Sequence, residues 1–312
     1  MKYIITLIFT LYSTFIGSAM ANQSNTINLF SETFGDKKNP AIILNAGAGN
    51  QAITWPAEFC NKLATKGYFV IRYDYRDTGL SSETNYELNP YNVMDLANDA
   101  IKILDKYHVE KAHFVGFSMG GQLAQFVGAY IPSRALSIIL IGTSTDFMPG
   151  FNAFENIWPE KGLSAPDRDY IKWQTSEVDF TKQSLDERVN DYIYTWRLLD
   201  GNPSNFDEEF FKKQGYEVFT RTTLNTPYIS HAKAMKASLE LHSKAPMLIK
   251  VPTLILQGEK DPVFPLDHGE DLHKKILNSK LVIMKDMGHA ISPRNFDSII
   301  SNIDSFIKKL SN

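Results

Sequence analysis

Apolar runs rich in β-branched residues alternate with segments of helical periodicity, and this alternation restricts the possible folds more than any other feature of the chain. The runs at 41–45, 68–74, 112–117 and 136–142 predict strands, and the segments at 56–67, 92–108 and 119–130 predict helices. Strands joined by helices in this order require right-handed crossovers, which produce a mostly parallel sheet. We therefore predict an α/β fold in which a mostly parallel, twisted sheet is flanked by helices on both faces.

The alternation stops between residues 144 and 246 and then resumes. This stretch is rich in aromatic and charged residues, and it predicts several helices that do not extend the sheet. Strand and helix patterns return in the segments 252–258, 265–277, 280–285 and 296–310. One interrupted sheet domain explains this order better than two tandem domains. We predict a core of residues 22–143 and 247–312 with a helical cap inserted at 144–246.

The N-terminal segment differs in kind from the rest of the chain. One lysine precedes a short apolar stretch, and Ala19 and Ala21 satisfy the small-x-small rule for signal-peptide cleavage. The alternative is an uncleaved membrane anchor, but the stretch is short against the ~20 residues that a membrane span requires. We expect residues 1–21 to be a signal peptide and the mature chain to begin near Asn22. The protein would then be exported, periplasmic or secreted if bacterial, without stable membrane insertion.

The charge gives no indication of nucleic-acid binding, and the cysteine content excludes a protein stabilised by internal disulfides. The chain of 312 residues has a formal net charge of -3 and no cluster of Lys and Arg, so nothing in it predicts nucleic-acid binding. Cys60 is the only cysteine, and an internal disulfide is therefore impossible. It shares a helical face with Phe59 and Leu63, so we expect a small buried apolar residue rather than a nucleophile.

The segment Gly116-Phe117-Ser118-Met119-Gly120 stands between a predicted strand and a predicted helix. A direct swing from strand to helix strains the central residue, and side chains two positions away would collide with the neighbouring backbone. The alternative is a glycine-rich turn selected for packing alone. In this context we predict that Ser118 is a nucleophile and that Gly116 and Gly120 form its elbow. The N–H groups after it open a helix N-terminus, which suits a developing oxyanion.

A serine nucleophile needs a base and an acid that orients the base. Among seven histidines, His289 stands apart because it follows Gly288 in a loop just after the last predicted strand. Loops at that edge of an open parallel sheet face the crevice where ligands bind. Asp261, after the preceding strand, is the predicted acid. Asp267 and Asp286 are the alternatives, but the former falls in the next helix and the latter is close to the strand terminus.

These motifs resemble the α/β-hydrolase superfamily over residues 26–312, through the Gly-Phe-Ser-Met-Gly elbow, "GEKDPVFP" and "MGH". The chain order Ser, Asp, His is the order of that fold. The stretches "ITWPAEFCNKLATKGYFVIRYDYRDTGLSS", "FVGFSMGG", "YTWRLLDGN" and "DMGHA" more closely resemble the aclacinomycin methylesterase group. The resemblance implies an α/β-hydrolase fold and methyl or other small-alcohol esters as substrates.

The resemblance also implies an oxyanion hole. Met119 directly follows the nucleophile and would supply one N–H. Many relatives carry His-Gly-x after the strand that corresponds to 41–45, with a tryptophan nine residues beyond the histidine. Counting back from Trp55 places Ala46 at the histidine position and Ala48 as the second donor, with Gly47 as the alternative.

Two other features of the family pattern differ here. Asp77 stands where most α/β-hydrolases carry glycine, in the loop Asp74-Tyr75-Arg76-Asp77-Thr78-Gly79-Leu80-Ser81, and we expect a structural role for this loop. Relatives begin with two strands before the one at 41–45, whereas here only "TINLFSETFG" is a plausible strand. A shortened sheet edge is therefore expected.

The function expected from these residues is hydrolysis of a small-molecule carboxylic ester by Ser118, His289 and Asp261 through an acyl-enzyme. No metal or organic cofactor is needed for it. The same triad supports other acyl chemistry, as in a lactonase, an amidase, an acyltransferase or a cofactor-free haloperoxidase or perhydrolase. A non-catalytic binding protein of the same fold is the alternative outside catalysis. The oligomeric state is not indicated.

Overall fold

A seven-stranded, mostly parallel sheet forms the centre of the molecule, as predicted. The computed structural model describes residues 27–176, 183–222 and 227–310, so the expected signal peptide lies outside the described residues. The strands run in the order β1-β3-β2-β4-β5-β6-β7, and only β1 is antiparallel to its neighbour. Their bounds are β1 Ser31–Phe34, β2 Ala41–Asn45, β3 Phe69–Tyr73, β4 Ala112–Phe117, β5 Ala135–Ile141, β6 Thr253–Gly258 and β7 Ser279–Met284.

The central strands are buried on both faces, which explains why they are continuous apolar runs without alternation. Every residue of β2, β3, β4 and β6 is buried, whereas the edge strand β7 is largely half-buried or exposed. In the described part of the chain a single strand, β1, precedes β2, and the shortened edge stays a prediction. The sheet therefore has the α/β architecture that the alternation predicts.

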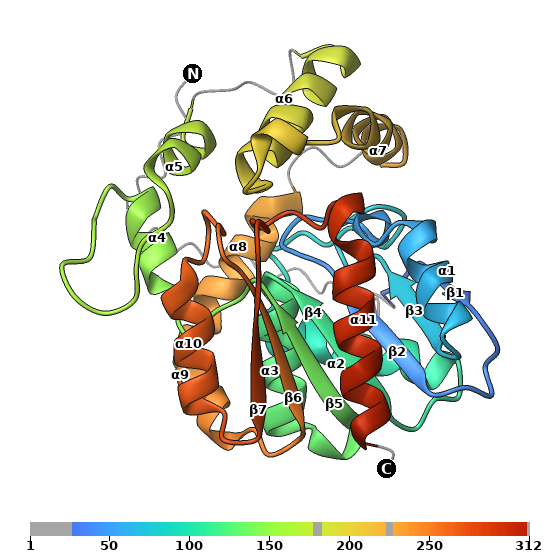
Figure 1. Ribbon diagram of the computed structural model, residues 1–312. Coiled ribbons are helices and arrows are strands. Elements are labelled where there is room, and N and C mark those ends of the chain that lie inside the picture. Colours follow the sequence, from blue (N-terminus) through green and yellow to red (C-terminus); the bar gives the residue numbers. More distant parts are fainter. Residues whose placement is uncertain (1–26, 177–182, 223–226, 311–312) are drawn as a thin grey trace, which may run out of the picture.

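Helices cover the two faces of the sheet (Figure 1). One side carries α1 and α11, which contact each other, and the other carries α2, α3, α9 and α10. Their bounds are α1 Ala57–Thr65, α2 Val93–Lys106, α3 Met119–Tyr130, α9 Leu239–Leu248, α10 Leu266–Lys275 and α11 Pro293–Leu310, and short 3-10 turns occur at Ala52–Thr54, Pro132–Arg134 and Pro203–Asn205. Cys60 in α1 is fully buried between core residues, as expected, and burial raises the pKa of its thiol to about 12.

The start of α2 shows how the sequence sets a helix boundary. The Asn92 side chain accepts hydrogen bonds from the N–H groups of Met94 and Asp95, at 2.8 and 3.2 Å. The Asp95 carboxylate in turn accepts from the Asn92 N–H at 2.9 Å. This reciprocal capping box satisfies N–H groups that have no partner inside the helix.

The segment between β5 and β6 is helical in its described residues and gathers at one end of the sheet (Figure 1). Its helices are α4 Met148–Phe154, α5 Arg168–Gln174, α6 Leu185–Leu199, α7 Glu208–Thr220 and α8 Pro227–Ala237. Many of its aromatic residues pack on one another: Phe211 stacks on Trp196 at 5.4 Å and on Phe206 at 4.8 Å between ring centroids. The following helix α9 packs against α3 of the core. The cap boundaries 144–246 stay a prediction.

No described helix combines the length and the apolar character needed to cross a membrane.

Candidate active site

Ser118 lies in the turn between β4 and α3, with φ of 55° and ψ of -119°. Side chains rarely occupy this region, so the turn is strained. A Cβ atom at Gly116 would lie 2.1 Å from the Gly120 carbonyl oxygen, and one at Gly120 would lie 2.3 Å from the Asn45 carbonyl oxygen. Backbone segments approach each other so closely here that only glycine fits at both positions. The turn can therefore present a serine side chain only with glycine on both sides.

Asp261 is the carboxylate that meets His289. Its Oδ2 atom lies 2.8 Å from His289 Nδ1, and its Oδ1 atom accepts from the N–H groups of Val263 and Phe264 at 2.8 Å each. The side chain of Asp261 is fully buried and that of His289 nearly so. The two backbone donors fix the carboxylate, so that its second oxygen is aimed at the imidazole. Nδ1–H of His289 donates to this oxygen, which leaves Nε2 free to act as a base.

The two alternative acids have other partners. Asp267 lies in α10, as expected, and accepts from the Ser164 N–H at 2.7 Å. Asp286 pairs with the Lys260 ammonium group at 2.7 Å, which lowers the pKa of Asp286.

The Asp261–His289 pair lies beside the strand that neighbours the serine turn. A Cβ atom at Gly142, just after β5, would lie 3.0 Å from Asp261 Oδ2 and 3.1 Å from His289 Nδ1. The His289 ring also packs 4.8 Å from the ring of Phe117, the residue before Ser118. Among the described residues no hydrogen bond joins the Ser118 hydroxyl to His289, so this contact stays a prediction. Such bonds often tighten only when substrate is bound.

The loop after β2 lies against the serine, where the predicted oxyanion donors are expected. A Cβ atom at Gly47 would lie 3.4 Å from Ser118 Cβ, and the Asn50 N–H donates to the Gly47 carbonyl at 3.2 Å to close a turn. Ala48 lies within this turn, and α3 begins at Met119 on the other side. The first N–H groups of a helix have no partner inside it, which leaves Met119 able to donate. Ala48 as the second donor, with Gly47 as the alternative, stays a prediction.

His231 of the cap helix α8 holds this loop, and sequence reasoning missed it. Its Nδ1 atom accepts from the Gly49 N–H at 2.9 Å, so the ring proton is on Nε2, which donates to the Arg76 carbonyl at 3.0 Å. The side chain is fully buried, and burial lowers its pKa to about 4. Nothing in the local pattern around position 231 distinguishes it from other helical histidines, because its partners are more than 150 positions away.

The loop that begins at Asp74 has the structural role that was expected. The buried Asp74 carboxylate accepts from the N–H groups of Ala52 and Leu80, at 2.7 and 2.9 Å, and pairs with Arg221 at the end of α7. Asp77 has a φ of 65° and accepts from the Tyr91 hydroxyl at 2.6 Å. Asp74 therefore connects the loop to both the core and the cap.

The neighbouring Arg76 pairs with the buried Asp99 of α2, through Nε at 2.7 Å. It thus braces the loop against a helix of the core.

Among the described residues no three His, Cys, Asp or Glu side chains are grouped so as to hold a metal ion.

Comparisons with known proteins agree with this architecture. A family model for the alpha/beta hydrolase fold matches residues 39–295. The chain is 32% identical over 278 residues to a rhodomycin D methylesterase of Streptomyces peucetius, covering 86% of this chain and 91% of that protein. It is 25% identical over 299 residues to a 3-oxoadipate enol-lactonase of Acinetobacter baylyi, covering 95% and 98%. A hydrolase structure from Pseudomonas aeruginosa superposes with a TM-score of 0.69 at 22% identity, covering 91% and 96%.

Proposed function

The chain belongs to the α/β-hydrolase family, as a carboxylic ester hydrolase of the aclacinomycin methylesterase-like group, and we propose that it cleaves methyl or other small-alcohol esters with a Ser-His-Asp triad. The observation that carries the proposal is the 2.8 Å hydrogen bond between Asp261 and His289, beside the strained turn at Ser118. The similarity to two rhodomycin D methylesterases, at 32% and 33% identity, supports the choice of a small alcohol.

In the proposed mechanism His289 removes the proton of Ser118 as the serine oxygen attacks the ester carbonyl. Asp261 holds the imidazole in one tautomer and stabilises the imidazolium that forms. The N–H groups of Met119 and of Ala48 or Gly47 bind the oxyanion of the tetrahedral intermediate, and one such donor is worth ~3 kcal/mol. The imidazolium then protonates the leaving alcohol. A water molecule, deprotonated by the same histidine, releases the acid from the acyl-enzyme.

Lactone cleavage is the second candidate, and the similarity to 3-oxoadipate enol-lactonases favours it over other acyl chemistry. The same residues would act, but the leaving alkoxide would remain attached to the acyl group. Hydrolysis rates measured under the same conditions on methyl esters, lactones, amides and p-nitrophenyl esters therefore distinguish the two candidate functions from each other and from an amidase. Acyl transfer would yield new ester products when a second alcohol is supplied. Peracid formation would yield a peracid product only when hydrogen peroxide is supplied.

Replacement of the nucleophile tests the proposal directly. Ser118→Ala is expected to lower kcat on p-nitrophenyl acetate by about 10⁴-fold or more, because triad members act as a unit. The variant's circular dichroism spectrum and urea midpoint should stay close to those of the unmodified protein, and this serves as the folding control. A folded Ser118→Ala protein with unchanged activity would rule out the triad, and an unmodified protein inactive on the whole panel would favour a binding protein.

Export of the protein remains a further proposal, supported by the small-x-small pattern at Ala19 and Ala21. Expression of the full chain in a bacterium, followed by N-terminal sequencing of the exported fraction, should yield a chain that begins near Asn22. Recovery of the intact N-terminus in the membrane fraction would contradict it.

A further inference from the structure

The end of the cap helix α6 lies directly against the loop that carries His289. The Leu199 carbonyl accepts from the N–H groups of His289 and Ala290, at 2.6 and 3.2 Å, and the Asp200 carbonyl accepts from the Gly288 N–H at 2.9 Å. Because α6 ends at Leu199, its last carbonyls have no partner inside the helix. The loop of the catalytic base therefore caps a helix of the inserted segment, although about ninety positions separate them.

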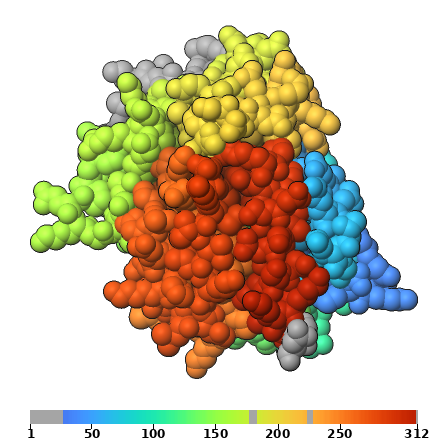
Figure 2. Space-filling model, in the orientation of Figure 1, coloured from blue at the N-terminus to red at the C-terminus, as the bar shows by residue number. Residues whose placement is uncertain are grey.

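Two glycines allow this approach of backbone to backbone. A Cβ atom at Gly288 would lie 2.2 Å from the Leu199 carbonyl oxygen. A Cβ atom at Gly201, where φ is 78°, would lie 2.5 Å from the Gly288 nitrogen. Both segments are thus shaped for contact with each other. In Figure 2 the yellow and gold atoms of α6 and α7 lie directly on the orange and red C-terminal part of the chain.

An ion pair between a partly exposed arginine and a buried aspartate stabilises the same contact. Arg294 at the start of α11 donates to Asp200 Oδ1 at 2.5 Å and to the Asp200 carbonyl at 2.8 Å. It also donates to the Asp286 carbonyl at 3.1 Å, on the other side of His289. Asp200 is fully buried, and burial raises its pKa while the Arg294 guanidinium opposes that shift. One guanidinium group therefore joins the chain before His289, the chain after it and the cap.

We propose that Asp200 and Arg294 are positioning residues for the catalytic base, which hold the His289 loop against the end of α6 so that the imidazole meets Asp261. The inference rests on the proposed triad and adds two residues that do not touch the reacting atoms. It also assigns a role to the segment "RLLDGN" at 197–202: the α6 end of the cap stays docked during turnover, because its release would free the base.

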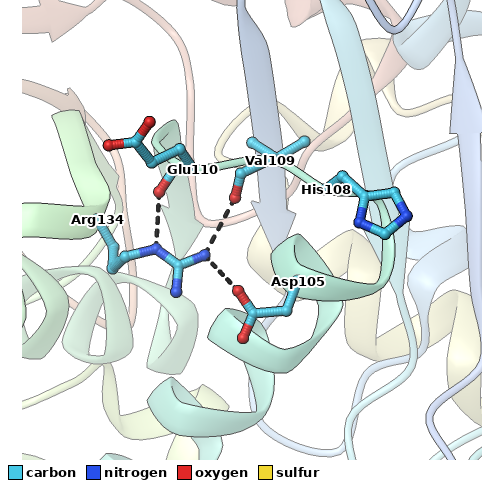
Figure 3. A pocket seen from close by; sticks show the side chains of 5 residues that line it. All are labelled: Asp105, His108, Val109, Glu110 and Arg134. Atoms are coloured by element: carbon cyan, nitrogen blue, oxygen red, sulfur yellow. Dashed lines mark hydrogen bonds and ion pairs between the residues drawn. The ribbon is translucent and has the colours of Figure 1, made fainter.

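The chain offers a control in Arg134, which lies before β5, at the other end of the strands from the His289 loop. Figure 3 shows its contacts. Arg134 donates to the carbonyls of Glu110 and Val109 and to the Asp105 carboxylate, at 2.7, 3.0 and 2.6 Å. Its side chain is 21% exposed, against 24% for Arg294. It lies between the N-terminal ends of β4 and β5, in a shallow hollow that also includes His108. The two arginines thus make the same kinds of contact and are similarly exposed, although Asp105 is 61% exposed and Asp200 is buried. Only Arg294 reaches the His289 loop.

The experiment compares Arg294→Met, Arg294→Lys, Asp200→Asn and Arg134→Met in the full chain, with Ser118→Ala as reference. For each variant, kcat, KM and the pH dependence of kcat/KM are measured with p-nitrophenyl acetate. The folded fraction comes from urea unfolding, and the rate of serine labelling by a fluorophosphonate reports activation of the nucleophile. Asp200→Asn keeps the carbonyl contacts and gives a milder test if Arg294→Met does not fold.

Arg294→Met is expected to lower kcat between about 10-fold and 100-fold with little change in KM, because small displacements of catalytic groups have effects of that size. The acid limb of kcat/KM should move to lower pH by about half a unit or more, since the imidazolium loses part of its stabilisation by Asp261. Arg294→Lys should recover part of kcat, and Arg134→Met should change neither quantity. A loss of folded protein alone would leave the acid limb in place.

A folded Arg294→Met protein with the kcat and acid limb of Arg134→Met would overturn the inference while leaving the triad intact. An unchanged acid limb in both Arg294→Met and Asp200→Asn would do the same. Activity that survives in Ser118→Ala would instead contradict the proposed function. The two failures are therefore distinguishable within one set of proteins.

Discussion

Replacement of His231 tests whether the cap builds part of the oxyanion site. His231→Phe keeps an aromatic ring of similar size but removes the acceptor of the Gly49 N–H and the donor to the Arg76 carbonyl. An unpaired buried group costs ~1–3 kcal/mol, and of the two partners only the Arg76 carbonyl is fully buried. We therefore expect a loss of about 1–3 kcal/mol in the free energy of unfolding. A domain is typically stable by only ~5–15 kcal/mol, so the variant should fold but unfold at a lower urea concentration.

The effect on activity follows from the place of Gly49, next to the two candidate oxyanion donors. If the loop shifts, one donor is lost to the tetrahedral intermediate, and a loss of ~10²-fold in kcat is expected with a smaller change in KM. The assay is p-nitrophenyl acetate hydrolysis at pH 7.5, normalised to the folded fraction. His231→Gln, which retains one donor and one acceptor, should recover part of the rate.

His242 of α9 provides the control. It is also fully buried, 5.1 Å from the Phe147 ring, but its Nε2 atom has no hydrogen-bond partner among the described residues. His242→Phe should therefore leave kcat close to that of the unmodified protein. The reasoning would be refuted by a folded His231→Phe protein whose kcat lies within about twofold of that of His242→Phe, since one lost oxyanion donor should cost far more.

Two further predictions concern stability. Burial lowers the pKa of His113 to about 4 and that of His242 to about 3, below the unfolded value of about 6.5, so the unfolded chain binds more protons in this range. The stability that these neutral side chains contribute is complete above pH 6.5 and is lost as the pH falls toward 4 for His113 and toward 3 for His242. At pH 5 the loss is about 2 kcal/mol for each histidine, which urea unfolding at pH 8 and pH 5 will measure. A His242→Leu variant with the pH dependence of the unmodified protein would contradict this. Arg221→Met leaves the buried Asp74 carboxylate without its cation, and we expect a loss of ~3–5 kcal/mol in the free energy of unfolding. A change below about 1 kcal/mol, the usual value of an exposed pair, would mean that the pair does not join cap and core.

Much of the fold could be predicted because its determinants are local. The parallel strands are buried on both faces, so their apolar runs stand out from the amphipathic helices between them. The strained turn at Ser118 requires glycine at 116 and 120, and this requirement leaves a spacing that can be recognised in the sequence. Asp261 and His289 could be proposed because each follows a strand, and the ends of neighbouring parallel strands meet at one edge.

The sequence by itself therefore determined the order of strands and helices, the elbow and the choice of a serine, an aspartate and a histidine at one edge of the sheet. Only the tertiary structure revealed that His231 binds the loop after β2, that Arg221 reaches Asp74, and that Arg294 pairs with Asp200 beside the His289 loop. Each of these contacts joins the cap to the core across many positions of the chain, and no local sequence pattern marks the residues that form it. These polar side chains stabilise the site because they are buried and must therefore pair with a partner. Which side chains are buried depends on how the inserted helices pack on the core, and the neighbouring residues along the chain do not determine it.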